Sequence, residues 1–492
     1  MIFSKKYFFS EYCLKRIIRS GLILCFLFIL GVNTNCPNPI SSIFSPPDDE
    51  PDLLETLLEL DLFGAVDILP DSGGGGCSPV SGTGSIDVNI SGSGGAGNVT
   101  VFGPSYERVL TATTSLSLPA GEYYVSPAPI RAASTAAVDG YKSATVSGTP
   151  MLCLDGGESL TIDVVYSSTV LPGRLWVLED GKMFGYNSGR LATLGAVEPD
   201  ATITLDTNSG ANRGIAFDDH GRVWISDSSA TGNYLMAYRV IDLQNSGTPT
   251  PVARITFSGI SDPRKIAFDS TGNLWVANAG SNTVIKFNAT DLNVSGEKTP
   301  SFSITGIVTP LSLSFDGADG SGNLWVTSDI INYVANVFKF SATQLATGSG
   351  GALTPAVSIR ACEAIGCSSV WRSPASIAFD SVGGSMYTHF GSTNTTIRLT
   401  SAEYAASGDK IPAVDHDLFG GASHMKLAFD ENGDLWVATG GSGLAKILAS
   451  SLGSSTTARG AIEGYITSSQ LTYPEDMAFF PTISGLPIAS SD

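Results

Sequence analysis

The chain has 492 residues, of which 55 are glycine and only 15% are charged, and its formal net charge is −19. This length allows several domains with a large core, and the glycine content suits a turn-rich all-β protein. A surface this acidic repels phosphates, so we expect neither nucleic acid nor an anionic membrane face as a partner. Alternatively, the acidity serves only to keep an exported protein soluble.

Residues 1–35 have the pattern of a secretory signal. Five Lys and Arg residues precede an apolar run at 21–30, which is too short to span a bilayer but suits a signal peptide. Cys36 follows, and it resembles the lipid-modified cysteine of bacterial lipoproteins; Asn33 and Asn35 before it resemble the looser signals of spirochete lipoproteins. The resemblance implies export to the cell envelope, with a lipid anchor on Cys36 in the outer membrane or at the cell surface. An ordinary secreted cysteine and an uncleaved anchor are the alternatives.

Residues 36–78 have the composition of an acidic and glycine-rich tether. The segment 46–51 is stiff and charged, and 72–76 is flexible. Between them, 52–63 would form a short amphipathic helix. We expect this region to separate the anchor from the folded domains.

Residues 79–170 predict a small β-sandwich. Polar and apolar residues alternate at 86–90, 98–101 and 160–166, as in strands with one buried face. The phrase from Leu118 to Val125 resembles the Leu-x-x-Gly-x-Tyr-x-Val strand of bacterial Ig-like and carboxypeptidase-regulatory-like sandwiches. The resemblance implies an Ig-like spacer or adhesive module without chemistry of its own.

One phrase recurs through residues 171–483: an apolar strand ending in Phe-Asp, a Gly/Asn turn, then Leu-Trp-Val. The aromatic residue of its second half recurs at intervals of 48, 51, 50, 62 and 49 residues, which indicates a repeat architecture. Each unit carries signals for four short strands, so the region predicts small antiparallel sheets stacked radially in a β-propeller. The recurring aromatic residues are Trp176, Trp224, Trp275, Trp325, Tyr387 and Trp436.

The two ends of the repeat region predict how the ring closes. The first unit begins directly at its second strand, 173–177, whereas 474–480 has the first-strand phrase with no second strand after it. We therefore expect the last strand to complete the first sheet, which gives a six-bladed propeller and leaves 484–492 as a tail. The protein is expected to be all-β and monomeric.

The repeat motif, Pro-x-x-Ile-Ala-Phe-Asp-x-x-Gly-x-Leu-Trp-Val, resembles that of NHL-repeat and related six-bladed propellers over residues 172–481. This group also takes in the gluconolactonase-like metal-dependent hydrolases. The resemblance implies the fold but no single function, because such propellers include hydrolases, lyases and binding platforms.

Three consecutive repeats place an oxygen-bearing side chain two residues after Leu-Trp-Val, namely Glu179, Asp227 and Asn278. The gluconolactonase-like relatives hold a divalent cation in the channel with Glu, Asn and Asp, so the resemblance implies a calcium or magnesium site here that would polarise a lactone carbonyl. The competing interpretation is structural, since such side chains often fix turns by local hydrogen bonds. We expect no other cofactor.

Other polar motifs in the propeller have simpler interpretations. The turns 269–273, 316–323 and 430–434 resemble calcium loops but lack the full register of ligands, so we interpret them as hairpin turns. The four histidines, His220, His389, His416 and His424, lie in different units and predict neither a metal site nor a catalytic triad.

Cysteine usage indicates an oxidising compartment. If Cys36 carries lipid, four cysteines remain in the mature chain. Cys77 and Cys153 bracket the sandwich, and Cys362 and Cys367 enclose a short loop, but four cysteines allow three pairings.

The longest interval between repeats contains an insertion at 360–374 with Trp371 and Arg372. An inserted loop on the rim of a propeller is a common place for recognition, and Trp and Arg are favoured interface residues. Alternatively, the loop is only braced by its cysteines.

Two functional hypotheses follow. The first is a non-catalytic cell-envelope lipoprotein whose propeller binds a protein or a glycan. The second is a metal-dependent lactonase, esterase or lyase that acts in the central channel. The lack of a recognisable general base or nucleophile favours the first.

Overall fold

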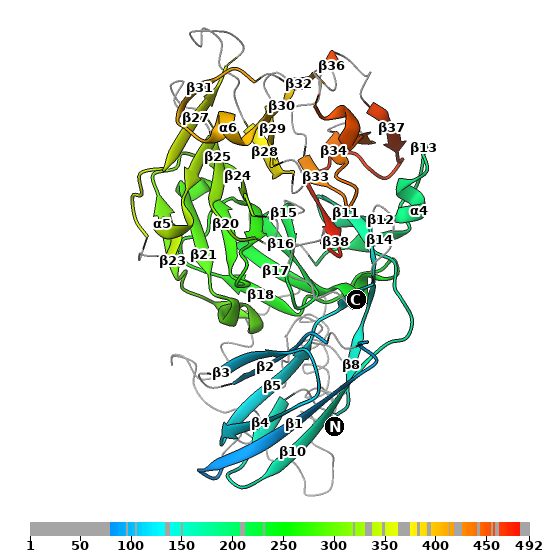
Figure 1. Cartoon of the computed structure of the whole chain (residues 1–492), viewed down its shortest axis with the longest axis vertical. Helices are drawn as coiled ribbons and strands as arrows, with labels where there is room; N and C mark the ends of the chain where they lie inside the picture. Colours follow the sequence, from blue (N-terminus) through cyan, green and yellow to red (C-terminus); the bar gives the residue numbers. More distant parts are fainter. Residues whose placement is uncertain are drawn as a thin grey trace, which may run out of the picture. The chain divides into compact units, whose positions relative to one another are not determined.

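We obtained a computed structural model of the chain, which describes residues 79–482 apart from short internal segments (Figure 1). Cys36, Cys77 and the rest of residues 1–78 lie outside the described residues, as does the C-terminal tail. The internal segments not described are 95–96, 104–105, 133–137, 149–150, 207–211, 230–231, 318–319, 330–336, 347–349, 363–373, 381–383, 391–394, 413, 418–425, 440–442, 454–455 and 458–461.

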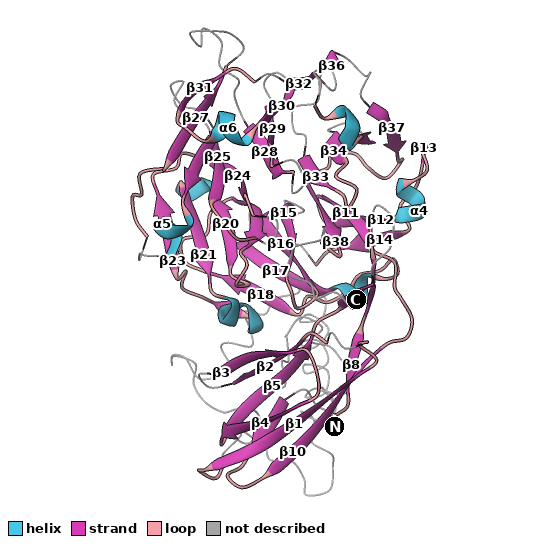
Figure 2. Ribbon diagram, in the orientation of Figure 1, coloured by secondary structure: helices cyan, strands magenta, loops and turns pink. Residues whose placement is uncertain are grey.

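Residues 83–166 form two four-stranded sheets around one apolar core, as predicted for a β-sandwich (Figure 2). Alternate residues of the long strands, such as Ile86, Val88, Ile162 and Val164, are fully buried between the sheets. One sheet has the order β4(Thr114–Pro119)-β1(Thr83–Ser91)-β10(Ser159–Tyr166)-β8(Ala144–Val146); the other is β3(Tyr106–Leu110)-β2(Val99–Gly103)-β5(Gly121–Pro127)-β9(Met151–Leu154).

The segment from Leu118 to Val125, predicted as one strand, is divided between β4 and β5 in opposite sheets. The chain turns at Ala120, whose N–H donates to the carbonyl of Gly82. Tyr123 then folds back, and its hydroxyl donates to the carbonyl of Pro119 at 2.9 Å. The prediction was wrong here because this phrase encodes a corner between two sheets.

The described strands after residue 171 form six sheets, the blades of a propeller. Each blade runs from an inner strand that lines the channel to an outer strand at the periphery of the propeller. Blades 1 to 3 are β38(Asp476–Phe480)-β11(Arg174–Glu179)-β12(Lys182–Asn187)-β14(Ala201–Thr204), β15(Asn212–Phe217)-β16(Arg222–Ser229)-β17(Gly232–Arg239)-β18(Ala253–Thr256) and β19(Pro263–Phe268)-β20(Leu274–Asn278)-β21(Thr283–Phe287)-β23(Phe302–Thr305).

Blades 4 to 6 repeat this plan, with short helices between strands. Their strands are β24(Pro310–Phe315)-β25(Leu324–Ser328)-β26(Val337–Phe340)-β27(Val357–Ala361), β28(Pro374–Phe379)-β29(Met386–Phe390)-β30(Thr395–Leu399)-β32(Val414–Asp417) and β33(Lys426–Phe429)-β34(Leu435–Thr439)-β35(Gly443–Ile447)-β37(Ile462–Thr467). The helices of the propeller are α4(Ser188–Leu191), α5(Ala342–Ala346), α6(Ser401–Tyr404), η1(Val240–Leu243), η2(Ala279–Ser281), η3(Ala289–Asn293) and η4(Ala449–Ser451).

The predicted closure of the ring is confirmed. The last strand, β38, pairs antiparallel with β11, the first strand of the propeller, and places Ala478 opposite Trp176. The same Ala-opposite-aromatic register recurs in four of the other five blades, for example Ala267 with Trp275, and in blade 4 Ser314 takes the place of the alanine. A single phrase in the sequence therefore fixes both strand pairing and register.

The Asp and the Trp of the recurring phrase are joined by a hydrogen bond. Trp275 donates its indole N–H to Asp269 at 2.8 Å, and the other carboxylate oxygen of Asp269 accepts backbone N–H groups of the turn. Asp218, Asp316 and Asp430 make the same indole bond to Trp224, Trp325 and Trp436. These turns are thus held by hydrogen bonds, as the structural interpretation of the calcium-like loops predicts.

The outer edges of the blades are covered by the neighbouring blade. Short strands from the connection in the next blade add to the outer strands of blades 2, 4, 5 and 6; they are β22(Gly296–Glu297), β31(Gly408–Lys410), β36(Thr456–Thr457) and β13(Gly195–Ala196). In blades 1 and 3 a single bridge does the same, from Ile203 to Gly247 and from Ile304 to Gly351. Open strand edges, which invite aggregation, are thereby reduced around the ring.

A hairpin of β6(Ile130–Ala132) and β7(Gly140–Lys142) contacts the propeller. The ring of Tyr141 packs edge-on against Phe480 with a centroid distance of 4.9 Å. Arg131, which is buried, forms ion pairs with Asp139 and with Glu431 in the turn between β33 and β34. Within the unit of residues 77–492, these contacts join the segment before the propeller to blades 1 and 6.

Candidate functional site

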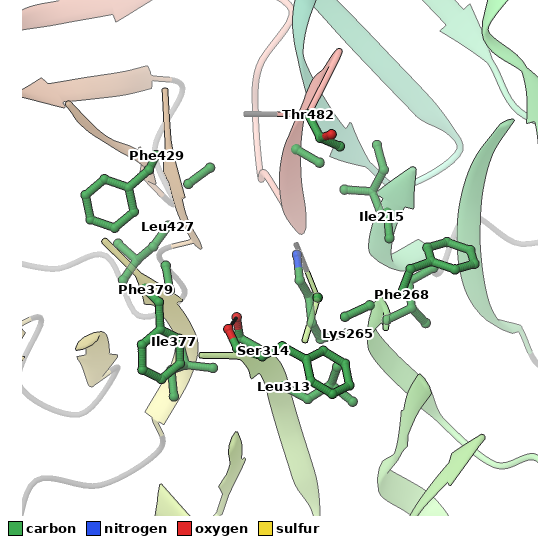
Figure 3. A pocket seen from close by; sticks show the side chains of 18 of the residues that line it. Ile215, Lys265, Phe268, Leu313, Ser314, Ile377, Phe379, Leu427, Phe429 and Thr482 are labelled. Carbon is green, nitrogen blue, oxygen red and sulfur yellow. Dashed lines mark hydrogen bonds between the residues drawn. The ribbon is translucent and has the colours of Figure 1, made fainter. Parts of the chain in front are cut away.

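The inner strands enclose a cavity of about 240 Å³ in the channel of the propeller (Figure 3). At one height, each of the six strands contributes a phenylalanine, and one residue earlier each contributes a small residue, Ala or Ser. The figure shows Lys265, Phe268 and Phe429 around this space. The phenylalanines are Phe217, Phe268, Phe315, Phe379, Phe429 and Phe479, and the small residues are Ala216, Ala267, Ser314, Ala378, Ala428 and Ala478.

Three residues before the phenylalanines, the inner strands carry different side chains in different blades. Three residues of a strand span about 10 Å, so this layer lies near the start of the strands, at the end of the channel that we call the mouth. Its six residues are Gly214, Lys265, Ser312, Ser376, Lys426 and Asp476.

An ion pair crosses this layer from blade 3 to blade 1. Lys265 donates to both carboxylate oxygens of Asp476, at 2.8 and 2.6 Å, and Asp476 also accepts the backbone N–H of Ile215 at 2.9 Å. Blade 2 lies between them and has Gly214 at this position. A Cβ on Gly214 would lie against the carbonyl oxygen of Arg264 and 2.9 Å from the Cα of Lys265. The missing side chain therefore lets the inner strands of blades 2 and 3 approach closely beside the Lys265–Asp476 ion pair.

Lys426 from blade 6 faces the same cluster. Its ammonium donates to the carbonyl of Ala375 at 3.2 Å. Burial lowers the pKa of Lys426, the charges of Asp476 and Glu475 oppose this effect, and Lys265 lowers the pKa further. The mouth thus holds a partly buried lysine with both acidic and basic side chains around it.

Two further ion pairs line the rim of the mouth, and the arginine of each is about one third exposed. Arg213 pairs with Glu475 at 2.5 Å, and Arg264 pairs with Asp262 at 2.8 Å. Burial raises the pKa of the neighbouring Asp180 carboxyl, and the negative charge of Glu475 raises it further. The rim therefore presents both signs of charge at fixed positions.

Glu179 fixes a loop at the rim. One of its oxygens accepts the backbone N–H groups of Thr472 and Tyr473, at 2.7 and 3.0 Å, and the other accepts the hydroxyl of Thr472 at 3.0 Å. Tyr473 is 41% exposed and is the one aromatic residue among the exposed large hydrophobic residues of the described part of the chain. The partly exposed Tyr473 thus lies on a loop whose backbone Glu179 fixes, two positions before Glu475.

Asn278, a second member of the predicted metal set, has an equivalent structural role in blade 3. Its amide oxygen accepts the N–H of Ser261 at 2.8 Å, and its amide nitrogen donates to the carbonyl of Gly259 at 3.0 Å. Glu179 and Asn278 thus each bind the loop that leads into the inner strand of their own blade. This agrees with the structural interpretation of these positions.

Asp227, the third member, is completely buried. Burial raises the pKa of its carboxyl, and a hydrogen bond from Tyr234 works against this effect. The loop that would correspond to those held by Glu179 and Asn278 is 207–211, which lies outside the described residues. The metal hypothesis remains a prediction at this position.

The described residues hold one group of three acidic or imidazole side chains with ligand atoms within 4.8 Å, namely Asp218, Asp219 and His220. Asp218 is already occupied, since it accepts the indole of Trp224 and the guanidinium of Arg222. His220 pairs with Asp219 at 2.8 Å. This group belongs to the turn of blade 2, far along the strand from the mouth layer.

The remaining predicted residues are only partly described. His389 is buried, and its Nδ1 lies 3.2 Å from the hydroxyl of Thr396, so it has a packing position. Cys153 and Cys362 are both disulfide-bonded, but Cys77 and Cys367 lie outside the described residues, so the pairing remains a prediction. Trp371 and Arg372 also lie outside them.

Sequence reasoning missed Lys265, Lys426 and Asp476. The motif Leu-Trp-Val draws attention to the second strand, whereas these residues lie on the inner strand, one position before the Ile-Ala-Phe part of the phrase. Comparison of the inner strands would have revealed this position, because its charge varies between blades while the Ile-Ala-Phe positions that follow it stay apolar or small.

Comparisons with known proteins add little to this geometry. No protein-family profile and no curated protein matches the chain. Among solved structures it is similar to a streptogramin B lyase, with 16% identity over 50% of this chain and 68% of that chain and a TM-score of 0.32. It is also similar to a chain of a nidogen/laminin complex, with 13% identity over 62% of this chain and 98% of that chain and a TM-score of 0.38. A chain of the COPII outer coat vertex on membranes is similar with 12% identity over 66% of this chain and 74% of that chain and a TM-score of 0.39.

Proposed function

We propose that this chain is a non-catalytic, exported binding protein, anchored by lipid at Cys36, which binds a protein or a glycan at the mouth of its propeller channel. The proposal includes an NHL-like propeller and an Ig-like spacer. The observation that carries it is Tyr473, which is exposed at the rim on a loop that three hydrogen bonds to Glu179 fix, one from the backbone N–H of Tyr473 and two from Thr472.

The surroundings of Tyr473 support binding. Tyrosine and arginine are enriched where proteins recognise partners, because they offer a large contact area together with hydrogen bonding. Arg213 and Arg264 are each held by a carboxylate at the same rim and remain about one third exposed. A site fixed in advance loses little conformational entropy when a partner binds.

The alternative is a metal-dependent lactonase, esterase or lyase in the channel. Two of its three proposed ligands, Glu179 and Asn278, already use their oxygens to bind backbone N–H groups. A cation at this level would have to compete with those bonds. The described geometry therefore favours binding over catalysis.

The test uses the full chain on arrays of glycans and of peptides. We expect one class of probe to bind, with affinity at least tenfold weaker for Tyr473→Ala and unchanged for Val294→Ala, which alters an exposed residue on the outside of blade 3. A tenfold loss corresponds to about 1.4 kcal/mol.

Two results would contradict the proposal. One is binding that Tyr473→Ala leaves intact. The other is chemical change of a bound probe, seen by mass spectrometry, which would support the catalytic alternative instead.

A further inference from the structure

We infer that the cavity in the channel is a binding site for a neutral, mainly apolar small molecule that carries one hydrogen-bonding group. The inner strands of all six blades line this cavity (Figure 3). Tyr473 is not among the lining residues, so the inference stands or falls independently of the proposed function.

The wall of the cavity is apolar all the way around the ring. Each inner strand contributes three successive residues to it, namely a large apolar residue, a small residue and a phenylalanine; in blade 3 these are Ile266, Ala267 and Phe268. Such a wall offers few partners to water, and a buried water needs roughly two to four polar groups to hold it. An apolar ligand that displaces poorly held water gains affinity.

The size of the cavity limits the size of the ligand. Its volume is about 240 Å³. An apolar cavity of roughly 150 Å³ in another protein takes up benzene, so this larger one suits a molecule of about eight to ten non-hydrogen atoms. Pockets lined mainly by apolar and aromatic groups, with a few polar groups, are typical of small-molecule sites.

The charged side chains of the lining already have partners within the protein, which favours a neutral ligand. Lys265 donates to both carboxylate oxygens of Asp476, at 2.8 and 2.6 Å. Asp316 accepts the indole N–H of Trp325 at 3.0 Å and two N–H groups of Asn323, at 2.7 and 2.8 Å. A charged ligand would therefore lose its hydration without displacing water from a free charge, and this desolvation is costly.

The hydrogen-bonding group of the ligand follows from Thr482. This residue lines the cavity, and its hydroxyl oxygen is buried without a hydrogen-bond partner within the described residues. The other hydroxyl of the lining, that of Ser314, donates to the carbonyl of Phe315 at 3.4 Å. Leaving a buried hydroxyl unpaired costs free energy. A hydroxyl or carbonyl oxygen on the ligand would supply the missing partner of Thr482.

The test uses probes that share a phenyl ring and a short chain but differ in the group at its end. They are phenylethanol, ethylbenzene, phenylacetate and phenethylammonium, each measured by calorimetry on the full chain. We expect phenylethanol to bind, and both charged probes to bind at least about tenfold more weakly because of their desolvation.

Thr482→Val tests the hydrogen bond, because it replaces the hydroxyl with a methyl group of similar size. We expect it to weaken the binding of phenylethanol about fivefold, which is the typical net effect of one hydrogen bond, and to leave the binding of ethylbenzene unchanged. Thr204→Val, at an exposed threonine of β14, is the matched control and should change neither affinity.

A second variant guards against misfolding of the first. Ala267→Leu fills part of the cavity without touching a charge, and we expect it to weaken the binding of both neutral probes at least about tenfold while the circular dichroism spectrum is retained. The inference is overturned if phenylethanol does not bind the folded wild-type chain at millimolar concentration. It is also overturned if either charged probe binds as well as phenylethanol, or if Thr482→Val affects phenylethanol and ethylbenzene equally.

Discussion

The two ends of the propeller channel differ in how strictly they repeat. At the phenylalanine end, all six inner strands present the same residue type, and four of the adjoining turns contain the same Asp–Trp hydrogen bond. At the mouth, the six strands present Gly, Lys, Ser, Ser, Lys and Asp. The repeat specifies the scaffold, and departures from it build the candidate site.

Backbone strain follows the same division. Asp262 and Thr309, which precede the inner strands of blades 3 and 4, have φ values of 46° and 41°. Residues other than glycine rarely adopt this left-handed conformation, and it concentrates at functional sites. Both lie at the mouth end of their strands.

The largest expected effect comes from breaking the regular end. Trp325 is completely buried and packs against Ile359, Ile377 and Met386. We expect Trp325→Ala to lower the free energy of unfolding by about 3–5 kcal/mol, since a cavity is left in the core between two blades. Urea unfolding measures this loss. Tyr473→Ala at the rim should change it by less than about 0.5 kcal/mol, and equal losses in the two variants would refute the division between scaffold and site.

A smaller effect is expected from restoring a side chain where the mouth lacks one. Gly214→Ala puts a Cβ against the backbone of Arg264 and Lys265. We expect it to cost about 1–3 kcal/mol, as overpacking usually does. Gly247→Ala is the matched control, because a Cβ there has no atom within 4 Å. If the two variants unfold at the same urea concentration, the close approach of the inner strands of blades 2 and 3 does not require glycine at 214.

The smallest effect concerns Asp227, and it depends on pH. Burial raises the pKa of this carboxyl in the folded chain above its unfolded value, so the ionised form disfavours folding at neutral pH. We expect Asp227→Asn to be more stable than the wild type at pH 7, with the difference disappearing as the pH falls below the unfolded pKa. Thermal unfolding between pH 3 and 8, with and without a chelator, measures it. A variant less stable than the wild type, with a chelator-sensitive wild type, would instead revive the metal hypothesis.

Sequence reasoning predicted the scaffold because its signals are local and repeated. The Phe-Asp turn and Leu-Trp-Val lie within about ten residues of each other, and they fix a hairpin, its register and its Asp–Trp bond. The closure by β38 followed from comparing the two ends of the repeat region. Leu118–Val125 misled because the corner at Ala120 depends on Gly82, 38 positions earlier in the chain.

The site was harder to predict because its contacts cross the ring. Lys265 and Asp476 are 211 residues apart and belong to blades that are not neighbours. The ion pair spans blade 2, whose inner strand has a glycine at this position, Gly214, and no local pattern predicts such a contact across the ring. The lipid anchor at Cys36, the disulfide pairing and the Trp371 loop concern residues outside the described part of the chain, and they remain predictions.

The short strands from each blade that pair with the outer strand of the blade before it link the blades around the ring. Because the connection within one blade also forms the outer edge of the blade before it, no blade can open without uncovering a strand edge next door. A pull applied at the first strand of the propeller would be shared around the whole ring, since the last strand closes that same blade. We expect the propeller to unfold as one unit under force.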